Sequence, residues 1–258
     1  MAPLVQKEQS PEELRKHVTA TYFTLRTGIA VIAAFLPLVL WLGGLIRFRL
    51  PLQSSMSAYY NTDMRDVFVG VLCATGAFLY LYKGFGDREN LALNAAGVFA
   101  VLTALIPPGG VKLEPFMLTP HGAAGVLFFV AIGYVCIFRA SDTLPLMKDR
   151  GAAEMYSRAY KLFGWAMIAS PVAAWLLNVL WRSGSPTGAY VFFVELLGVW
   201  TFAAYWILKS RELAQTDAEH LVAAGAVETD VSGNVCRAAA PVPAVGGSAP
   251  VGALDPQV

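Results

Sequence analysis

Residues 28–46 read GIAVIAAFLPLVLWLGGLI, a run without a single charged side chain. The hydrocarbon core of a membrane is about 30 Å thick and is crossed by about 20 apolar residues in a helix. A helix is required because, in lipid, every backbone N–H and C=O group must find its hydrogen-bond partner within its own segment. This stretch therefore predicts a transmembrane helix.

Further stretches share this apolar character. In chain order they are residues 66–82, 91–107, 120–138, 160–181 and 190–208. Charged residues make up only 14% of the 258 residues, against about 25% in an ordinary soluble domain. We therefore predict an all-α fold, a polytopic integral membrane bundle of six transmembrane helices.

The chain divides into three parts around this bundle. Residues 1–27 are expected to be a cytoplasmic segment with a short amphipathic helix, because Ser10, Pro11 and Glu13 have the pattern of a capped helix start. Residues 28–208 form the transmembrane domain, and residues 209–258 form a cytoplasmic tail. This tail ends in a stretch rich in Ala, Pro, Gly and Val, so we expect it to be largely disordered beyond about residue 225.

The Lys and Arg residues predict the orientation, because positively charged loops stay on the cytoplasmic side. One side of the predicted bundle holds fourteen of the nineteen: Lys7, Arg15, Lys16, Arg26, Lys83, Arg88, Arg139, Lys148, Arg150, Arg158, Lys161, Lys209, Arg211 and Arg237. The other side holds five: Arg47, Arg49, Arg65, Lys112 and Arg182. We therefore expect the N- and C-termini in the cytoplasm and the helices in the cell membrane, which requires an even number of spans.

Two local features predict details of the packing. Small side chains repeat every four residues in the third span: Ala92, Ala96, Ala100 and Ala104. Such a stripe lets a neighbouring helix approach closely. Pro37 and Pro171 lie inside the first and fifth spans, where proline removes a backbone donor and kinks the helix.

Several classes of function find no support in the sequence. The net charge is +1 and the basic residues are dispersed, so we expect no nucleic-acid partner. Cys73, Cys136 and Cys236 show no CxxC spacing, which argues against a zinc cluster or a disulfide framework, and we expect no metal centre. No phosphate-binding glycine loop, GxSxG or HExxH motif is present, and the sequence indicates no particular cofactor.

The first outer loop is the segment richest in polar groups. It contains Ser57, Tyr60, Asp63, Arg65 and Asp66 at a predicted membrane boundary. In one interpretation these residues cap the second span and form an interfacial aromatic belt. In the other, the two carboxylates lie on one helix face and join the serine and the tyrosine in an outward-facing polar pocket.

Two ionisable residues in other spans could belong to the same pocket. His121 begins the fourth span on the outer side, where it either fills a helical turn or acts with Asp66 as an acid–base pair or as a metal ligand. Glu195 lies about five residues into the sixth span, and an ionisable residue within a membrane helix indicates a functional site by default. Arg182, Arg65 and His121 are its expected partners.

The segment SMSAYYNTDMRDVFVG (55–70), the segment GFGDRENLALNAAGVFAVLTALIP (84–107) and the Pro120-His121 pair resemble an uncharacterised family of bacterial multi-pass membrane proteins. The resemblance covers the first four spans. It implies the same membrane topology and a role for the first outer loop, but it implies no reaction.

A fainter similarity exists to the superfamily of alkaline ceramidases and progestin-receptor-like membrane hydrolases. That similarity implies zinc held by a serine, an aspartate and histidines, with Ser57 and Asp66 in the first two positions. Here Asn61 occupies the place where a histidine is wanted, and the helix with two histidines is missing. These departures argue against a zinc hydrolase.

Three functional hypotheses follow. The favoured one is a multi-pass membrane protein that binds a lipid, a small amphiphile or a partner through the outer polar pocket. The second is a membrane-embedded lipid hydrolase, similar to a ceramidase, that uses Asp66, His121 and Glu195. The third is a small proton-coupled transporter in which Glu195 carries the proton. Apart from the lipid bilayer, the sequence identifies neither a partner nor an oligomeric state.

Overall fold

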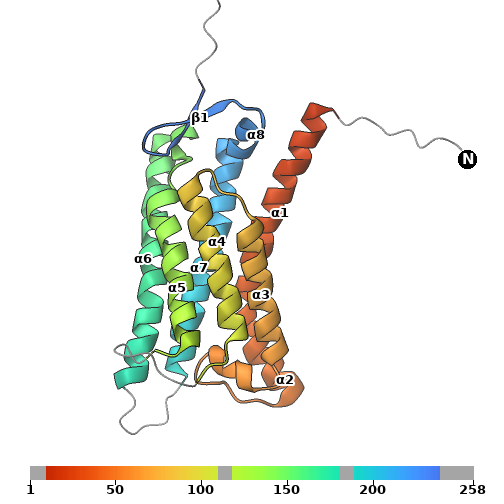
Figure 1. Cartoon of the computed structure of the whole chain (residues 1–258), viewed down its shortest axis with the longest axis vertical. Coiled ribbons are helices and arrows are strands. Elements are labelled where there is room, and N and C mark those ends of the chain that lie inside the picture. The colour runs from red at the N-terminus through yellow and green to blue at the C-terminus, as the bar shows by residue number, and fades with distance from the viewer. Residues whose placement is uncertain (1–9, 110–117, 181–188, 239–258) are drawn as a thin grey trace, which may run out of the picture.

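The computed structural model of the chain describes residues 10–109, 118–180 and 189–238. Six long helices lie along its long axis (Figure 1): α1 (Pro11–Leu38), α3 (Arg65–Leu81), α4 (Asp87–Leu105), α5 (Pro120–Tyr134), α6 (Arg150–Leu180) and α7 (Tyr190–Thr216). The shorter elements are η1 (Val39–Gly43), α2 (Gly44–Phe48), η2 (Ser57–Asn61), η3 (Val135–Arg139), η4 (Leu144–Leu146), α8 (Ala218–Ala223), β1 (Val227–Thr229) and β2 (Val235–Arg237).

The long helices form a closed ring. From α3 to α7 each helix packs against the next one in chain order, and α1 closes the ring by contacting both α3 and α7. The start of α1 lies at the same end of the bundle as α8 and the strands, and α2 lies at the other end (Figure 1). We call the end with residues 218–237 the tail end, and the end with residues 44–61 the loop end.

Four segments of the described chain are long and apolar enough to cross a membrane: Pro11–Phe48, Pro120–Leu146, Arg150–Leu177 and Tyr190–Thr216. The other two long helices, α3 and α4, are not among them. α3 has 17 residues, and α4 has 19 but begins with charged side chains. The structure therefore has the composition of an all-α membrane bundle.

The outer surface of the bundle is apolar. Ile46 is 80% exposed, Leu91 is 72% exposed and Leu162 is 67% exposed. Soluble monomers rarely expose contiguous apolar patches larger than a few hundred Å². Side chains of this kind on several helices are those expected of a surface that faces lipid.

Small residues bring α3 and α4 together, as the alanine stripe predicts. Ala96, Ala100 and Ala104 are buried, with exposures of at most 1%. At Gly76 on α3 a side chain would begin 2.6 Å from the carbonyl oxygen of Gly97 on α4, and the reverse holds at Gly97. The two backbones therefore touch, and neither glycine can carry a side chain without separating the helices.

Both internal prolines disturb their helices locally. The π-helical turn η1 begins at Val39, two residues after Pro37. Pro171 has no N–H to donate to the carbonyl of Met167, and the Ser170 hydroxyl donates to that oxygen instead, at 3.1 Å. The carbonyl that the proline leaves unpaired thus receives a side-chain donor.

The ends of the helices differ from the expected boundaries. The capping box at Ser10 and Glu13 is present, but it starts one continuous helix to Leu38 rather than a short helix within residues 1–27. No glycine or proline lies between Glu12 and Thr27 to end it. α6 likewise begins at Arg150, ahead of the predicted 160, and α7 continues to Thr216.

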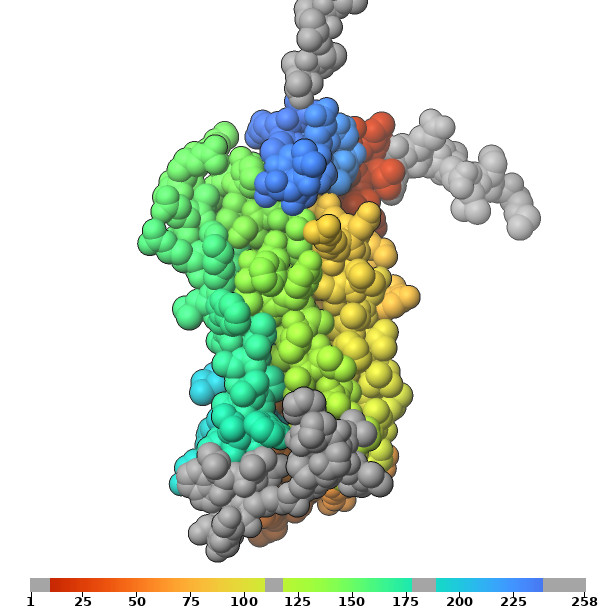
Figure 2. Space-filling view, turned by 60° about the vertical axis from the view of Figure 1, so that its left-hand side comes forward, coloured from red at the N-terminus to blue at the C-terminus, as the bar shows by residue number. Residues whose placement is uncertain are grey.

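The tail also differs from the disordered segment expected beyond residue 225. β1 and β2 pair as an antiparallel hairpin in which Val227 faces Arg237. Val235 is buried with Leu146, Leu213 and Ala218. This small apolar cluster docks the hairpin on the tail end, where Figure 2 shows the C-terminal segment in blue over the helices. Residues 239–258 of the expected tail lie outside the described residues.

Candidate functional site

A cavity of about 390 Å³ lies inside the loop end. Side chains from α1 and α3 to α7 line it, together with the loop of residues 54–57. Three of the predicted site residues line it: Ser57, His121 and Glu195. Ligand pockets are typically concave and measure about 300–1,000 Å³, so the cavity has the size of a small-molecule site.

The lining changes in character with depth. The polar residues Ser57, His121 and Glu195 lie in the loop or within about one and a half turns of a helix start. Two or more turns into their helices, the lining is apolar: Leu72, Phe128, Phe129 and Val199. Thr103, in the last turn of α4 at the loop end, and the deeper Ser170 donate their hydroxyl protons to backbone carbonyls of their own helices. The cavity therefore has a polar mouth and an apolar interior.

Glu195 lies where the loop of residues 54–57 is fixed to α7. One of its carboxylate oxygens accepts the backbone N–H of Met56 at 2.6 Å, and the N–H of Phe192 donates to the Ser54 carbonyl at 3.0 Å. Among the described residues no cation forms an ion pair with Glu195. Of its expected partners, Arg182 lies outside the described residues. The carboxylate is half-buried against the cavity.

His121 connects the start of α5 to the end of α4. Its Nδ1 lies 2.9 Å from the carbonyl oxygen of Ile106, a group at a helix C-terminus with no partner in its own helix. In the neutral ring this contact places the proton on Nδ1 and leaves Nε2 as an acceptor. The side chain is 7% exposed and lies beside the ring of Phe68. The ring also interacts with the backbone of Thr103 in the last turn of α4, so His121 joins the ends of these two helices.

Tyr60, Asp63, Arg65 and Asp66 do not join this cavity. The Arg65 guanidinium donates to the Tyr60 hydroxyl at 2.8 Å and stacks on its ring, and both aspartates are exposed. The reason is helical geometry. Phe68 and Leu72 of α3 face the cavity, and Asp66 precedes Phe68 by two residues, which is about 200° around the helix. The pocket of paired carboxylates is therefore not formed, and Asp66 does not meet His121 or Glu195.

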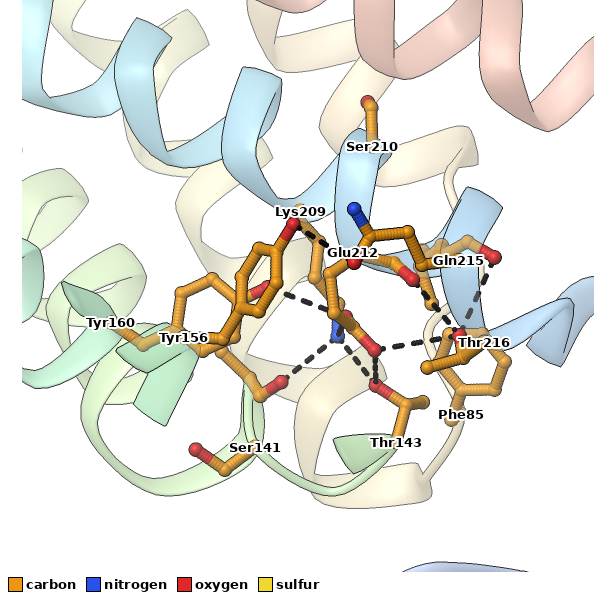
Figure 3. A network of polar contacts seen from close by, with 12 residues as sticks. Phe85, Ser141, Thr143, Tyr156, Tyr160, Lys209, Ser210, Glu212, Gln215 and Thr216 are labelled. Atoms are coloured by element: carbon orange, nitrogen blue, oxygen red, sulfur yellow. Dashed lines mark hydrogen bonds and ion pairs between the residues drawn. The ribbon is translucent and has the colours of Figure 1, made fainter. Parts of the chain in front are cut away.

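The tail end holds a buried polar network that the sequence analysis missed (Figure 3). Lys209 on α7 is 2% exposed, and its ammonium donates to the Ala140 carbonyl, the Thr143 hydroxyl and the Glu212 carboxylate at 2.9, 2.7 and 2.6 Å. Glu212 also accepts from Thr143 at 2.9 Å and from Tyr160 at 3.3 Å. A lysine ammonium has three donors, so this group is fully satisfied.

Further ion pairs surround this one. Arg26 on α1 is 1% exposed, pairs with Glu219 and donates to the Ser210 hydroxyl at 3.2 Å. Arg139 pairs with Asp142 at 2.5 Å and lies against the hairpin turn at Gly233. We call these charged groups the tail-end network: Arg26, Arg139, Asp142, Lys209, Glu212 and Glu219. They connect α1, α7, α8 and the hairpin.

One sequence signal could have revealed this network. Lys209 and Glu212 are three residues apart, directly after an apolar span, and such a pair lies on one helix face. From the sequence alone, Lys209 and Arg26 were interpreted only as cytoplasmic charges. Their burial depends on the continuation of α7 and on the docked hairpin, and the expectation of a disordered tail left no structure to cover them.

The chemical groups available at the loop end are few. Within the described part of the chain, no group of three or more His, Cys, Asp or Glu side chains could hold a metal ion. The cysteines at positions 73, 136 and 236 are free. What the loop end does present is one carboxylate, one imidazole acceptor and several serines at the mouth of an apolar cavity.

Comparisons of the chain with protein-family models, with curated proteins and with solved structures found no match. The two family resemblances of residues 55–121 therefore stay expectations, and the argument for function depends on the site itself.

Proposed function

We propose that the chain is a multi-pass protein of the cell membrane, with six spans and both termini in the cytoplasm. α3 and α4 have their places in the ring between helices that are long and apolar enough to cross. The position of α1's start beside the tail end supports an even number of crossings (Figure 1). The excess of Lys and Arg on that side supports its assignment to the cytoplasm.

We further propose that the loop-end cavity binds a lipid or a small amphiphile. The observation that carries this proposal is the polarity of the cavity, with Ser57, His121 and Glu195 at the mouth and Phe128 and Val199 inside. An amphiphile has the same distribution, a polar head and an apolar tail. The volume of about 390 Å³ suits a single-chain molecule better than a phospholipid with two acyl chains.

The test fills the cavity without disturbing the fold. Gly125 on α5 lines the cavity, and a side chain there would find its nearest neighbour, Thr103, at 3.9 Å. Leucine at this position occupies the space a ligand would need. Gly70 on α3 is the matched control, because a side chain there meets nothing within 4 Å and points away from the cavity. Both changes replace a helical glycine with leucine and therefore raise helix propensity equally.

The measurement is native mass spectrometry of the purified protein, with the bound small molecules released and weighed. We expect a bound amphiphile in the wild type and in Gly70→Leu, and at least a fivefold loss in Gly125→Leu. Equal amounts of the same molecule in all three proteins would overturn the proposal, since the molecule would then lie outside the cavity.

A lipid hydrolase is the second candidate, because His121 and Glu195, an imidazole and a carboxyl group, line one cavity. Asp66 has no part in it. Quantitative lipid profiling of membranes with wild-type protein and with folded His121→Ala protein tests this candidate. A lipid that is consumed, with its product formed, only by the wild type would establish catalysis, and identical profiles would exclude it.

A further inference from the structure

We infer that the ligand of the loop-end cavity carries a positive charge, as a single-chain alkylamine does, and that Glu195 is its counter-ion. This inference rests on the proposed function and adds the chemical class of the ligand. It comes from the balance of charge in the cavity rather than from its shape.

At the loop end, an acidic residue lines the cavity, whereas no described Lys or Arg residue does. Glu195 lines the cavity, and no described residue forms an ion pair with it. Arg65, at the start of α3, is turned onto the ring of Tyr60 and donates to its hydroxyl. Within the described lining, therefore, an acidic side chain is present without a Lys or Arg side chain to pair with it.

A carboxylate in this position costs free energy unless something compensates its charge. The backbone N–H groups of Met56, at 2.6 Å, and of Ser57 both interact with this carboxylate. An ionised carboxylate has about four acceptor positions on its two oxygens, so these two contacts leave capacity for a ligand. An ammonium group provides both the missing charge and N–H donors, and its hydrogen bonds to a carboxylate are stronger than those between neutral groups.

The rest of the lining fits the same ligand. The hydroxyl groups of Ser55 and Ser57 also lie at the mouth, with their oxygen atoms 3.0 Å apart. Both oxygens can accept a hydrogen bond from an ammonium group. Trp175 and Phe129 contribute aromatic surface to the wall, which tolerates a cation far better than aliphatic surface does. The deeper apolar part receives the alkyl chain. A carboxylate or sulfate head would instead face Glu195 with a like charge.

The experiment uses the full chain in phosphatidylcholine nanodiscs with dodecylamine that carries a diazirine in its alkyl chain. Photo-crosslinking to cavity peptides is measured while unlabelled dodecylamine, dodecanol or dodecanoate competes, each at a defined ratio to lipid. We expect dodecylamine to compete at a concentration at least about tenfold lower than dodecanol, the scale of one charge-assisted hydrogen bond. Dodecanoate should be the weakest competitor.

The matched variants are Glu195→Gln and Glu195→Asp. Glutamine removes the charge but keeps an oxygen for the Met56 N–H, so the outer loop retains its anchor, and melting temperature checks the fold. The preference for the amine over the alcohol should fall to less than about threefold in Glu195→Gln and should persist in Glu195→Asp. Equal competition by the amine and the alcohol in the wild type, or an unchanged preference in Glu195→Gln, would overturn the inference.

The proposed function can fail separately. If Gly125→Leu blocks crosslinking but the head group makes no difference, the cavity binds amphiphiles and the charge assignment is wrong. If crosslinks fall outside the cavity and Gly125→Leu changes nothing, the binding proposal itself is wrong.

Discussion

The two ends of the bundle use ionisable residues in opposite ways. At the tail end, Lys209 and Glu212 are buried and every donor of the ammonium has an acceptor. At the loop end, Glu195 has the backbone N–H groups of Met56 and Ser57 as donors and no described cation as a partner, and it lines a cavity of about 390 Å³. All three residues belong to α7, with Glu195 and Lys209 about 21 Å apart along the helix.

The number of partners distinguishes an ionisable residue that stabilises the fold from one that can bind a ligand. Burial alone marks an ionisable residue as unusual, but a group whose partners are complete has nothing to offer a ligand. Glu195 lines a cavity, and no described cation pairs with it. These two features together indicate a binding site. The predictions below are ordered from the largest expected change in stability to the smallest.

Lys209→Met should lower the free energy of unfolding by about 3–5 kcal/mol, because it leaves the carboxylate of Glu212 buried without its cation. The measurement is reversible unfolding of the protein in mixed detergent micelles. The control is Arg158→Met, which breaks a pair of the same charge type on the surface, where the side chains are 82% and 71% exposed. A loss for Lys209→Met no larger than that of the control would mean that the tail-end pair is not structural.

Gly97→Leu should cost about 1–3 kcal/mol, since its side chain must push α4 away from the Gly76 carbonyl on α3. Gly125→Leu, the same substitution facing the cavity, should leave the melting temperature unchanged or raise it. Thermal unfolding followed by circular dichroism measures both. If the two variants were equally unstable, the space beside Gly125 would not be a true cavity.

Gly233→Ala should weaken the docking of the hairpin at a cost of about 1 kcal/mol or more. The residue has φ +91°, a conformation that disfavours side chains, and a Cβ atom would collide with the Arg139 guanidinium. Faster limited proteolysis within residues 226–238, with the membrane helices intact, is the expected readout. An unchanged cleavage rate would show that the hairpin does not depend on this turn.

Glu195→Ala should cost about 1 kcal/mol, the scale of the hydrogen bond to the Met56 N–H, and Glu195→Gln should cost less because it keeps an acceptor. The same unfolding measurement compares the two variants. A loss for Glu195→Gln of the size expected for Lys209→Met would mean that Glu195 is a structural charge like the tail-end pair, and the contrast between the two ends would disappear.

Local sequence features predicted the helices and much of the candidate site. The apolar runs located every long helix, the alanine stripe located the contact of α4, and Ser10, Pro11 and Glu13 located the start of α1. Ser57, His121 and Glu195 were singled out because polar and ionisable groups at a membrane boundary are unusual. These predictions depend on composition and on helical periodicity, and both can be read along the chain.

The errors arose where the outcome depended on rotation about a helix axis or on contacts distant in sequence. Asp66 has the right depth but lies on the wrong side of α3, since Phe68 and Leu72 face the cavity. Arg26 was interpreted from the sequence as an ordinary cytoplasmic charge, because its ion-pair partner, Glu219, is distant in sequence.

The sequence by itself determined that this protein is a bundle of apolar helices, because the absence of water in lipid requires each apolar run to satisfy its own backbone. It also determined where the ionisable residues lie along those helices. Only the tertiary structure decided which of these residues have all their hydrogen-bond and ion-pair partners within the protein and which can still bind a ligand. The ring of helices leaves a space beside Glu195 and His121, whereas the docked hairpin closes the end that holds Lys209 and Glu212, and neither result is encoded in a local pattern.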